Sequence, residues 1–214
     1  MDRRKALKTI GYGAGAITVT PAVVGLFQSC QSNTGQFTPI HFTQDEFSVV
    51  SQLMDLILPE TDIPGAIELK LPEFVDGYID TIYSETAQKD IALELDQFIA
   101  AALSDTDKSK ASQLDREDLD GQLAKYLKAD QSQKKAWGKQ TSDYRKAVKS
   151  DSNASVPQEA LAYSFAIRLR SLSISSFKTN EYIGENVLAY APIPGEQKGC
   201  VDLMETTGGK IWSL

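Results

Sequence analysis

The feature that most constrains this fold is the spacing of apolar residues between positions 43 and 178. They recur every three or four positions in one run after another, which is the period of an amphipathic helix. No alternating pattern of useful length predicts a strand. The chain is therefore predicted to be all-α, an irregular bundle of about six helices.

Capping residues and prolines place the helices along the chain. Thr43 and Glu46 form a capping box, Pro59 ends the helix that follows, and Pro72 opens the second helix. Further helices are predicted over 88–103, 115–128 and 131–149, and from Pro157 onward. The second helix is predicted to bury Phe74, Val75, Tyr78, Ile79 and Ile82. The fifth is predicted to have a sparse apolar face of Trp137, Tyr144 and Val148.

The sequence pattern changes after Phe177, where prolines and glycine pairs interrupt the helical spacing of apolar residues. A short helix is predicted over 181–188. The remainder is predicted to be an extended, Pro/Gly-rich C-terminal tail that lies on the helical body.

Charge and residue counts exclude several functions. The net charge is −7, so nonspecific nucleic-acid binding, which needs a basic face, is not expected. The chain has two cysteines and one histidine, too few for a Cys/His zinc site, and no haem-attachment motif. A catalytic histidine would have to be His41, in a predicted linker beside Phe42.

The first 29 residues are basic at the start and carry no charge from Thr9 to Ser29. The stretch is long enough for a membrane span, but it contains several glycines and Pro21. Its Gly-Tyr-Gly-Ala-Gly run lacks the preceding strand that a nucleotide loop requires. The order of a basic region, a mildly apolar region and small residues instead predicts an export signal. The start resembles the twin-arginine motif, whose matching residues are Arg3, Arg4, Leu7 and Lys8.

Cys30 follows this stretch at once, and residues 26–30 resemble a bacterial lipobox. We predict that Cys30 is lipidated, that 1–29 is the export signal, that 30–42 is a flexible tether, and that 43–214 is the helical domain. The expected location is the periplasm, with the protein anchored to the membrane as a lipoprotein. The alternative is cleavage near Ser29 by an ordinary peptidase, which leaves Cys30 as a free thiol.

Two further features carry alternative interpretations. Glu60 and Asp62 share a Pro- and Gly-punctuated loop, where they either cap backbone amides or act as metal ligands or an acid/base pair. Capping is favoured because such residues cap so commonly. Cys200 is either a buried structural cysteine or a thiol that bridges to another subunit. No catalytic, cofactor-binding or metal-binding residue is predicted.

Two segments resemble the gluconate 2-dehydrogenase subunit 3 family. The first runs from Leu58 to Ala66 and is similar to the pattern L-P-x-T-D-x-P-G-A; Leu71–Asp76 is similar to the helix start that follows it. Its family-type residues are Pro59, Glu60, Thr61, Asp62, Pro64 and Gly65. The second resembles the closing motif of the family, through Tyr182, Tyr190, Pro192, Pro194, Gly195, Gly199 and Cys200. The resemblance spans roughly residues 43–214.

The resemblance implies a non-catalytic small subunit of a membrane-associated sugar or sugar-acid dehydrogenase. Such a subunit holds no cofactor; its partner is a large GMC-type flavoprotein that carries FAD, and a cytochrome c subunit with haem takes the electrons. The expected partner surface is the tail, with Tyr182, Tyr190, Pro192, Pro194, Gly195, Cys200 and Trp212 as its contacts. The alternative is a stand-alone periplasmic lipoprotein enzyme that uses Glu60 and Asp62.

Overall fold

The computed structural model describes residues 37–151, 153–191, 195 and 199–213. Two compact units are distinguished, Met1–Phe37 and Thr38–Leu214, and apart from Phe37 the described residues belong to the second. The predicted export residues Arg3, Arg4, Leu7 and Lys8 lie outside the described residues, as do Cys30, Pro192 and Pro194.

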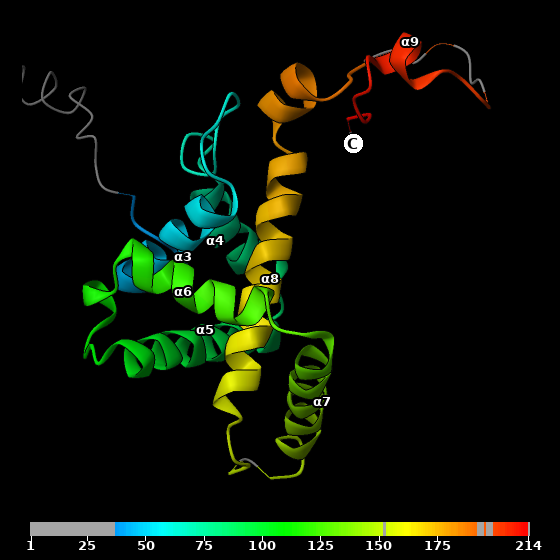
Figure 1. Ribbon diagram of the computed structural model, residues 1–214. Helices are drawn as coiled ribbons and strands as arrows, with labels where there is room; N and C mark the ends of the chain where they lie inside the picture. Colours follow the sequence, from blue (N-terminus) through cyan, green and yellow to red (C-terminus); the bar gives the residue numbers. More distant parts are fainter. Residues whose placement is uncertain (1–36, 152, 192–194, 196–198, 214) are drawn as a thin grey trace, which may run out of the picture. The chain divides into compact units, whose positions relative to one another are not determined.

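The second unit is built of helices, as predicted (Figure 1). Its long helices are α3 (Gln44–Ile57), α4 (Leu71–Ile82), α5 (Glu85–Thr106), α6 (Arg116–Leu127), α7 (Gln131–Ala147) and α8 (Gln158–Lys178). Short elements are η2 (Ala111–Gln113), η3 (Ile183–Val187) and α9 (Leu203–Thr207). No strand forms within the described ranges, where the only pairing of that kind is an isolated bridge between Ala189 and Trp212. None of the described helices is long and apolar enough to cross a membrane.

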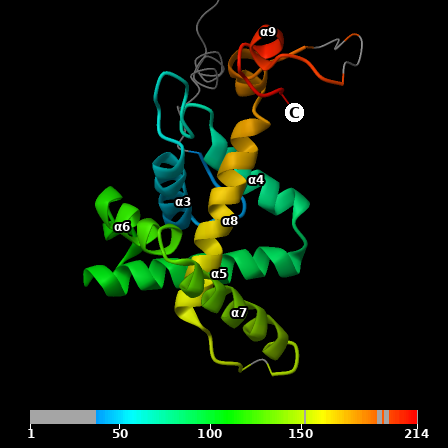
Figure 2. The ribbon, with the colours of Figure 1, turned by 45° about the vertical axis from the view of Figure 1, so that its right-hand side comes forward.

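Helix α8 is the centre of the unit. It packs most extensively on α5, crosses that helix, and also contacts α3, α4, α6 and α7 (Figures 1 and 2). Phe98 of α5 lies between Tyr126 of α6 and Phe165 of α8, with ring centroids 5.9 and 5.4 Å away. Trp137 of α7 extends this row, 5.4 Å from Tyr126. Burial of large aromatic side chains at the helix crossings stabilises the arrangement.

Polar residues set several helix boundaries. The predicted capping box of α3 is confirmed: Thr43 Oγ1 accepts from the Glu46 backbone N–H, and the Glu46 carboxylate accepts from the Thr43 N–H at 2.7 Å. Helix α5 begins before the predicted residue 88 because Ser84 caps it at 3.3 Å. Helix α9 was not predicted; the Asp202 side chain caps it, and Gly208, with a positive φ of 62°, ends it.

Two predicted apolar faces are partly wrong. On α4, Val75 and Ile79 are buried, but Phe74, Tyr78 and Ile82 are exposed. The helix is turned so that Asp76, rather than the aromatic residues, shares the buried face with Val75 and Ile79. Beyond the end of α7, Val148 is exposed, whereas the predicted Trp137 is buried.

Asp76 ties the start of the unit to α4. Its side chain is fully buried and accepts three backbone hydrogen bonds, from Ile40 at 2.7 Å, His41 at 3.1 Å and Phe42 at 3.0 Å. Phe42 is itself buried in the core. The compact unit thus begins at Thr38, before the predicted domain start at residue 43.

Candidate partner-binding site

The loop between α3 and α4 contains the first family-like segment and folds back tightly on itself. The Ala66 N–H donates to the Leu58 carbonyl at 2.9 Å and closes the loop. A Cβ added to Gly65 would lie 2.5 Å from the Glu60 backbone nitrogen, so only glycine fits there. Thr61 turns the tip: its N–H donates to the Ile63 carbonyl at 3.1 Å, and its hydroxyl accepts from the Ile63 N–H at 3.4 Å.

The same loop ends in an unusual backbone conformation. Lys70 has a positive φ of 52°, in the left-handed region that residues with a side chain seldom adopt. Leu71 nonetheless donates to the Ala66 carbonyl at 2.9 Å, and Phe74 donates to the Lys70 carbonyl at 3.1 Å. These hydrogen bonds on either side stabilise the strained backbone of Lys70, and such strain tends to occur at functional sites.

The second family-like segment begins directly after α8. The Asn180 side-chain oxygen accepts from the Tyr182 N–H at 3.0 Å, and the Asn180 backbone carbonyl accepts from the Gly184 N–H at 2.8 Å. The π-helical turn η3 follows, which matches the place of the predicted short helix. The end of the tail then returns to this turn, since Ser213 donates to the Ala189 carbonyl at 2.8 Å.

The two segments meet at one groove. Pro64 and Lys70 of the loop and Tyr182 of the tail line a depression of about 460 Å³. The other lining residues are Glu68, Leu69, Asn180 and Glu181. Segments more than one hundred residues apart in the sequence therefore form one surface, and the strained Lys70 is part of it.

Apolar side chains are exposed along the tail, which begins at this groove with Tyr182. Tyr182, Tyr190 and Trp212 are 48%, 50% and 51% exposed. Val201, Leu203, Met204 and Ile211 are also exposed. None of the residues of α9 is buried. We call these seven side chains, which all belong to residues 182–212, the tail patch.

Two further predicted tail contacts, Cys200 and Gly195, lie among the described residues. Cys200 is a free, exposed thiol, so the interpretation as a buried structural cysteine is wrong. Gly195 has a positive φ of 70°, a conformation that glycine adopts without strain.

Glu60 and Asp62 both occupy solvent-exposed positions in the loop. The side chain that turns the loop belongs to Thr61 rather than to either acid, so capping by Glu60 or Asp62 is not observed. Among the described residues no group of three or more His, Cys, Asp or Glu side chains is placed to hold a metal ion. His41 stacks edge-on against Phe42 at 4.8 Å; it lies within the compact unit rather than in a linker, and among the described residues its Nε2 atom is buried without a hydrogen-bond partner.

Sequence reasoning missed a buried ionic cluster on α5. Glu94 is 1% exposed in its side chain and binds two arginines: Arg168 Nε donates to Oε2 at 2.8 Å, and Arg145 donates to Oε1. The Ser164 hydroxyl adds a bond to Oε1 at 2.8 Å. The hydrogen bond to Glu94 raises the pKa of Arg168 further above its usual value. The sequence did carry a signal for this buried cluster, since Glu94 lies on the same helical face as Ile91 and Phe98.

Taken together, the described residues form an all-helical domain in which residues of the tail and of the α3–α4 loop line one groove. The chain belongs to the gluconate 2-dehydrogenase subunit 3 family, whose model matches residues 44–195. Both the α3–α4 loop and Tyr190 fall within this range, whereas Cys200 and Trp212 lie beyond it. Membership indicates an accessory subunit of a dehydrogenase complex. No curated protein and no solved structure matches the chain.

Proposed function

We propose that this chain is the non-catalytic small subunit of a periplasmic, membrane-associated dehydrogenase that oxidises a sugar or sugar acid. Its partner is a large GMC-type flavoprotein with FAD, which performs the oxidation, and a cytochrome c subunit with haem accepts the electrons. The small subunit supports the export, anchoring and stability of the flavoprotein. Membership of the gluconate 2-dehydrogenase subunit 3 family supports the assignment to a complex.

The tail patch is the observation that carries the proposal. Fourteen large apolar side chains are exposed in the described part of the unit, and seven of them are concentrated within residues 182–212. Leaving them in water is unfavourable by about 25 cal/mol for each Å² of apolar surface. A partner that covers them removes this cost, and aromatic residues such as Trp212 and Tyr190 commonly anchor protein interfaces.

The groove extends the same surface to the α3–α4 loop. Pro64 and Tyr182 meet there, so the two segments that define the family by sequence both face the proposed partner. The tail contributes Pro192, Pro194, Gly195 and Cys200 as further contacts. This arrangement gives the tight Gly65 turn a role, which is to present the loop beside the tail.

Export and anchoring rest on the N-terminal sequence. Arg3 and Arg4 direct transport of folded cargo by the twin-arginine route, and the flavoprotein crosses the membrane bound to this subunit. Cys30 then carries the lipid that holds the complex at the membrane. Replacing both arginines by lysine is expected to leave the small subunit and the flavoprotein in the cytoplasm.

Co-purification tests the partner assignment. The tagged full chain is expressed with a GMC-type flavoprotein, and the eluate is assayed for flavin absorbance and dehydrogenase activity. The wild-type chain is expected to retain the flavoprotein in a one-to-one ratio. A variant with Met204→Ser and Trp212→Ala is expected to lose most of the bound flavoprotein. Val148→Ser, an exposed apolar change beyond the end of α7, serves as the matched control. Recovery of the wild-type chain alone from membranes, or equal retention by all three proteins, contradicts the proposal.

A further inference from the structure

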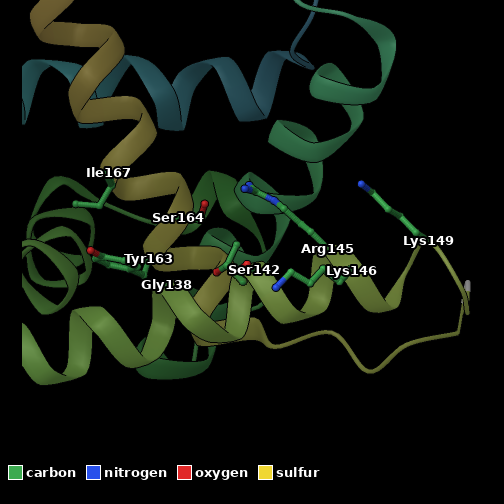
Figure 3. A pocket seen from close by; sticks show the side chains of 9 residues that line it. Gly138, Ser142, Arg145, Lys146, Lys149, Tyr163, Ser164 and Ile167 are labelled. Atoms are coloured by element: carbon green, nitrogen blue, oxygen red, sulfur yellow. The ribbon is translucent and has the colours of Figure 1, made fainter.

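A second depression lies far from the tail along α8, between that helix and α7. Figure 3 shows its lining side chains; α7 contributes Ser142, Arg145 and Lys146, and α8 contributes Tyr163 and Ser164. Lys149 lies just beyond the end of α7. The volume is about 380 Å³, within the range of small-molecule sites.

The charge of this pocket is opposite to that of the protein. The whole chain has a net charge of −7, yet Arg145, Lys146 and Lys149 line the pocket and none of its described lining residues is acidic. In the described part of the chain, Lys149 forms no ion pair, and Lys146 has only a long contact of 4.0 Å to Asp143. A concave surface with cations of this kind concentrates anions.

Arg145 is held in place before any ligand arrives. Its one ion pair among the described residues is to Glu94, which is buried and is also bound by Arg168 and Ser164. Glu94 thereby fixes the guanidinium at the pocket wall, and a guanidinium has five donors in a planar fork. Figure 3 shows the Arg145 and Lys149 side chains extending in the same direction, four residues apart. A cation that is already ordered loses little conformational entropy on binding.

The other walls define the size and character of the ligand. Ser142 adds a hydroxyl, whereas the Tyr163 ring gives an apolar face. We propose that the pocket binds a small organic anion, with its carboxylate or phosphate group on Arg145 and its carbon skeleton toward Tyr163, while Lys146 and Lys149 add positive charge to the same pocket. This site is separate from the tail patch and independent of the proposed partner.

Tyr163 also supplies the means to detect binding. Its ring centroid lies 5.2 Å from that of Trp137, so a ligand on Tyr163 alters the environment of this tryptophan. The chain has two tryptophans, and Trp212→Phe leaves Trp137 as the only one. The full chain with this change is titrated with sodium citrate and, separately, with inorganic phosphate, at ionic strength held constant with sodium chloride. A saturable fluorescence change with a Kd of about 1 mM or tighter is expected for at least one of them.

Matched variants locate the site. Lys149→Gln is expected to weaken binding about threefold, because it removes one of the positive charges of the pocket. Lys139→Gln changes another exposed lysine, one of α7 that does not line the pocket, and it is expected to leave the Kd unchanged. Arg145 is not suited to this test because its loss leaves Glu94 with one arginine fewer. A linear response that sodium chloride reproduces, or equal weakening by both lysine variants, overturns the proposal.

Discussion

Replacement of Asp76 tests how the start of the domain is fixed. The carboxylate lies on the buried face of α4 and accepts three backbone hydrogen bonds from Ile40, His41 and Phe42. Asp76→Asn keeps the size of the side chain but replaces one oxygen with an N–H₂ group. At least one backbone N–H then faces another donor, whichever way the amide is turned.

The magnitude follows from these contacts. The least damaging orientation of the new amide sacrifices the bond from Ile40, which is only partly buried, and keeps weaker bonds from His41 and Phe42. A hydrogen bond to a charged group contributes about 1.5–3 kcal/mol, so we expect a loss of about 2 kcal/mol in the free energy of unfolding. Asp76→Ala removes all three acceptor contacts and strands the buried Phe42 N–H, which raises the expected loss to about 4 kcal/mol.

Urea unfolding monitored by circular dichroism measures the global loss, and amide hydrogen exchange locates it. In Asp76→Asn, the amides of residues 40–42 are expected to lose protection, while α5 and α8 keep theirs. Asp80→Asn, an exposed change on the same helix, is the control and is expected to lie within about 0.5 kcal/mol of wild type. If Asp76→Asn is as stable as Asp80→Asn and residues 40–42 stay protected, the reasoning from the three hydrogen bonds is refuted.

Three further perturbations follow from the core and the loop. Glu94→Gln leaves Arg145 and Arg168 without their buried counter-charge, so the free energy of unfolding measured in urea titrations is expected to fall by about 3 kcal/mol. An unchanged free energy of unfolding would contradict this expectation. Gly65→Ala forces its methyl group onto the loop backbone and is expected to cost more than about 2 kcal/mol, whereas Gly121→Ala, which has open space, is expected to stabilise by up to about 1 kcal/mol. Burial, with help from a nearby carboxylate, raises the pKa of Tyr126 well above that of an unfolded tyrosine, near 10. The unfolded chain alone therefore loses this proton above about pH 10, and stability should fall there by up to about 1.4 kcal/mol per pH unit. Tyr126→Phe should reduce that slope in alkaline unfolding curves, and an unchanged slope would count against the assignment.

The helices could be predicted because their signals are local. Thr43 and Glu46 lie within one turn, and the capping bonds depend on little beyond that turn. Ser84 carried the same kind of signal for α5 and shows why the predicted start at residue 88 came too late. The family-like loop could also be found from its residues, because Gly65 is required by contacts with its own near neighbours.

The faces of the helices depended on distant partners. Apolar periodicity places Phe74 and Tyr78 on a stripe with Ile79, but the pairing of Asp76 with residues 40–42 turns α4 so that the aromatic residues face outward. No local pattern signals this turn of the helix, because the energetic gain comes from donors more than thirty residues away. The same holds for Glu94, whose two arginines come from α7 and α8.

The amino-acid sequence by itself therefore determined the helical class, most helix boundaries and membership of the family, because capping, periodicity and tight turns are short-range effects. Only the tertiary structure decided where Pro64 meets Tyr182, which apolar residues stay in water, and how Glu94 orders Arg145 at a basic pocket. These features arise when side chains far apart in the sequence compete for burial and for one another's charge, and that competition is settled only when the helices pack.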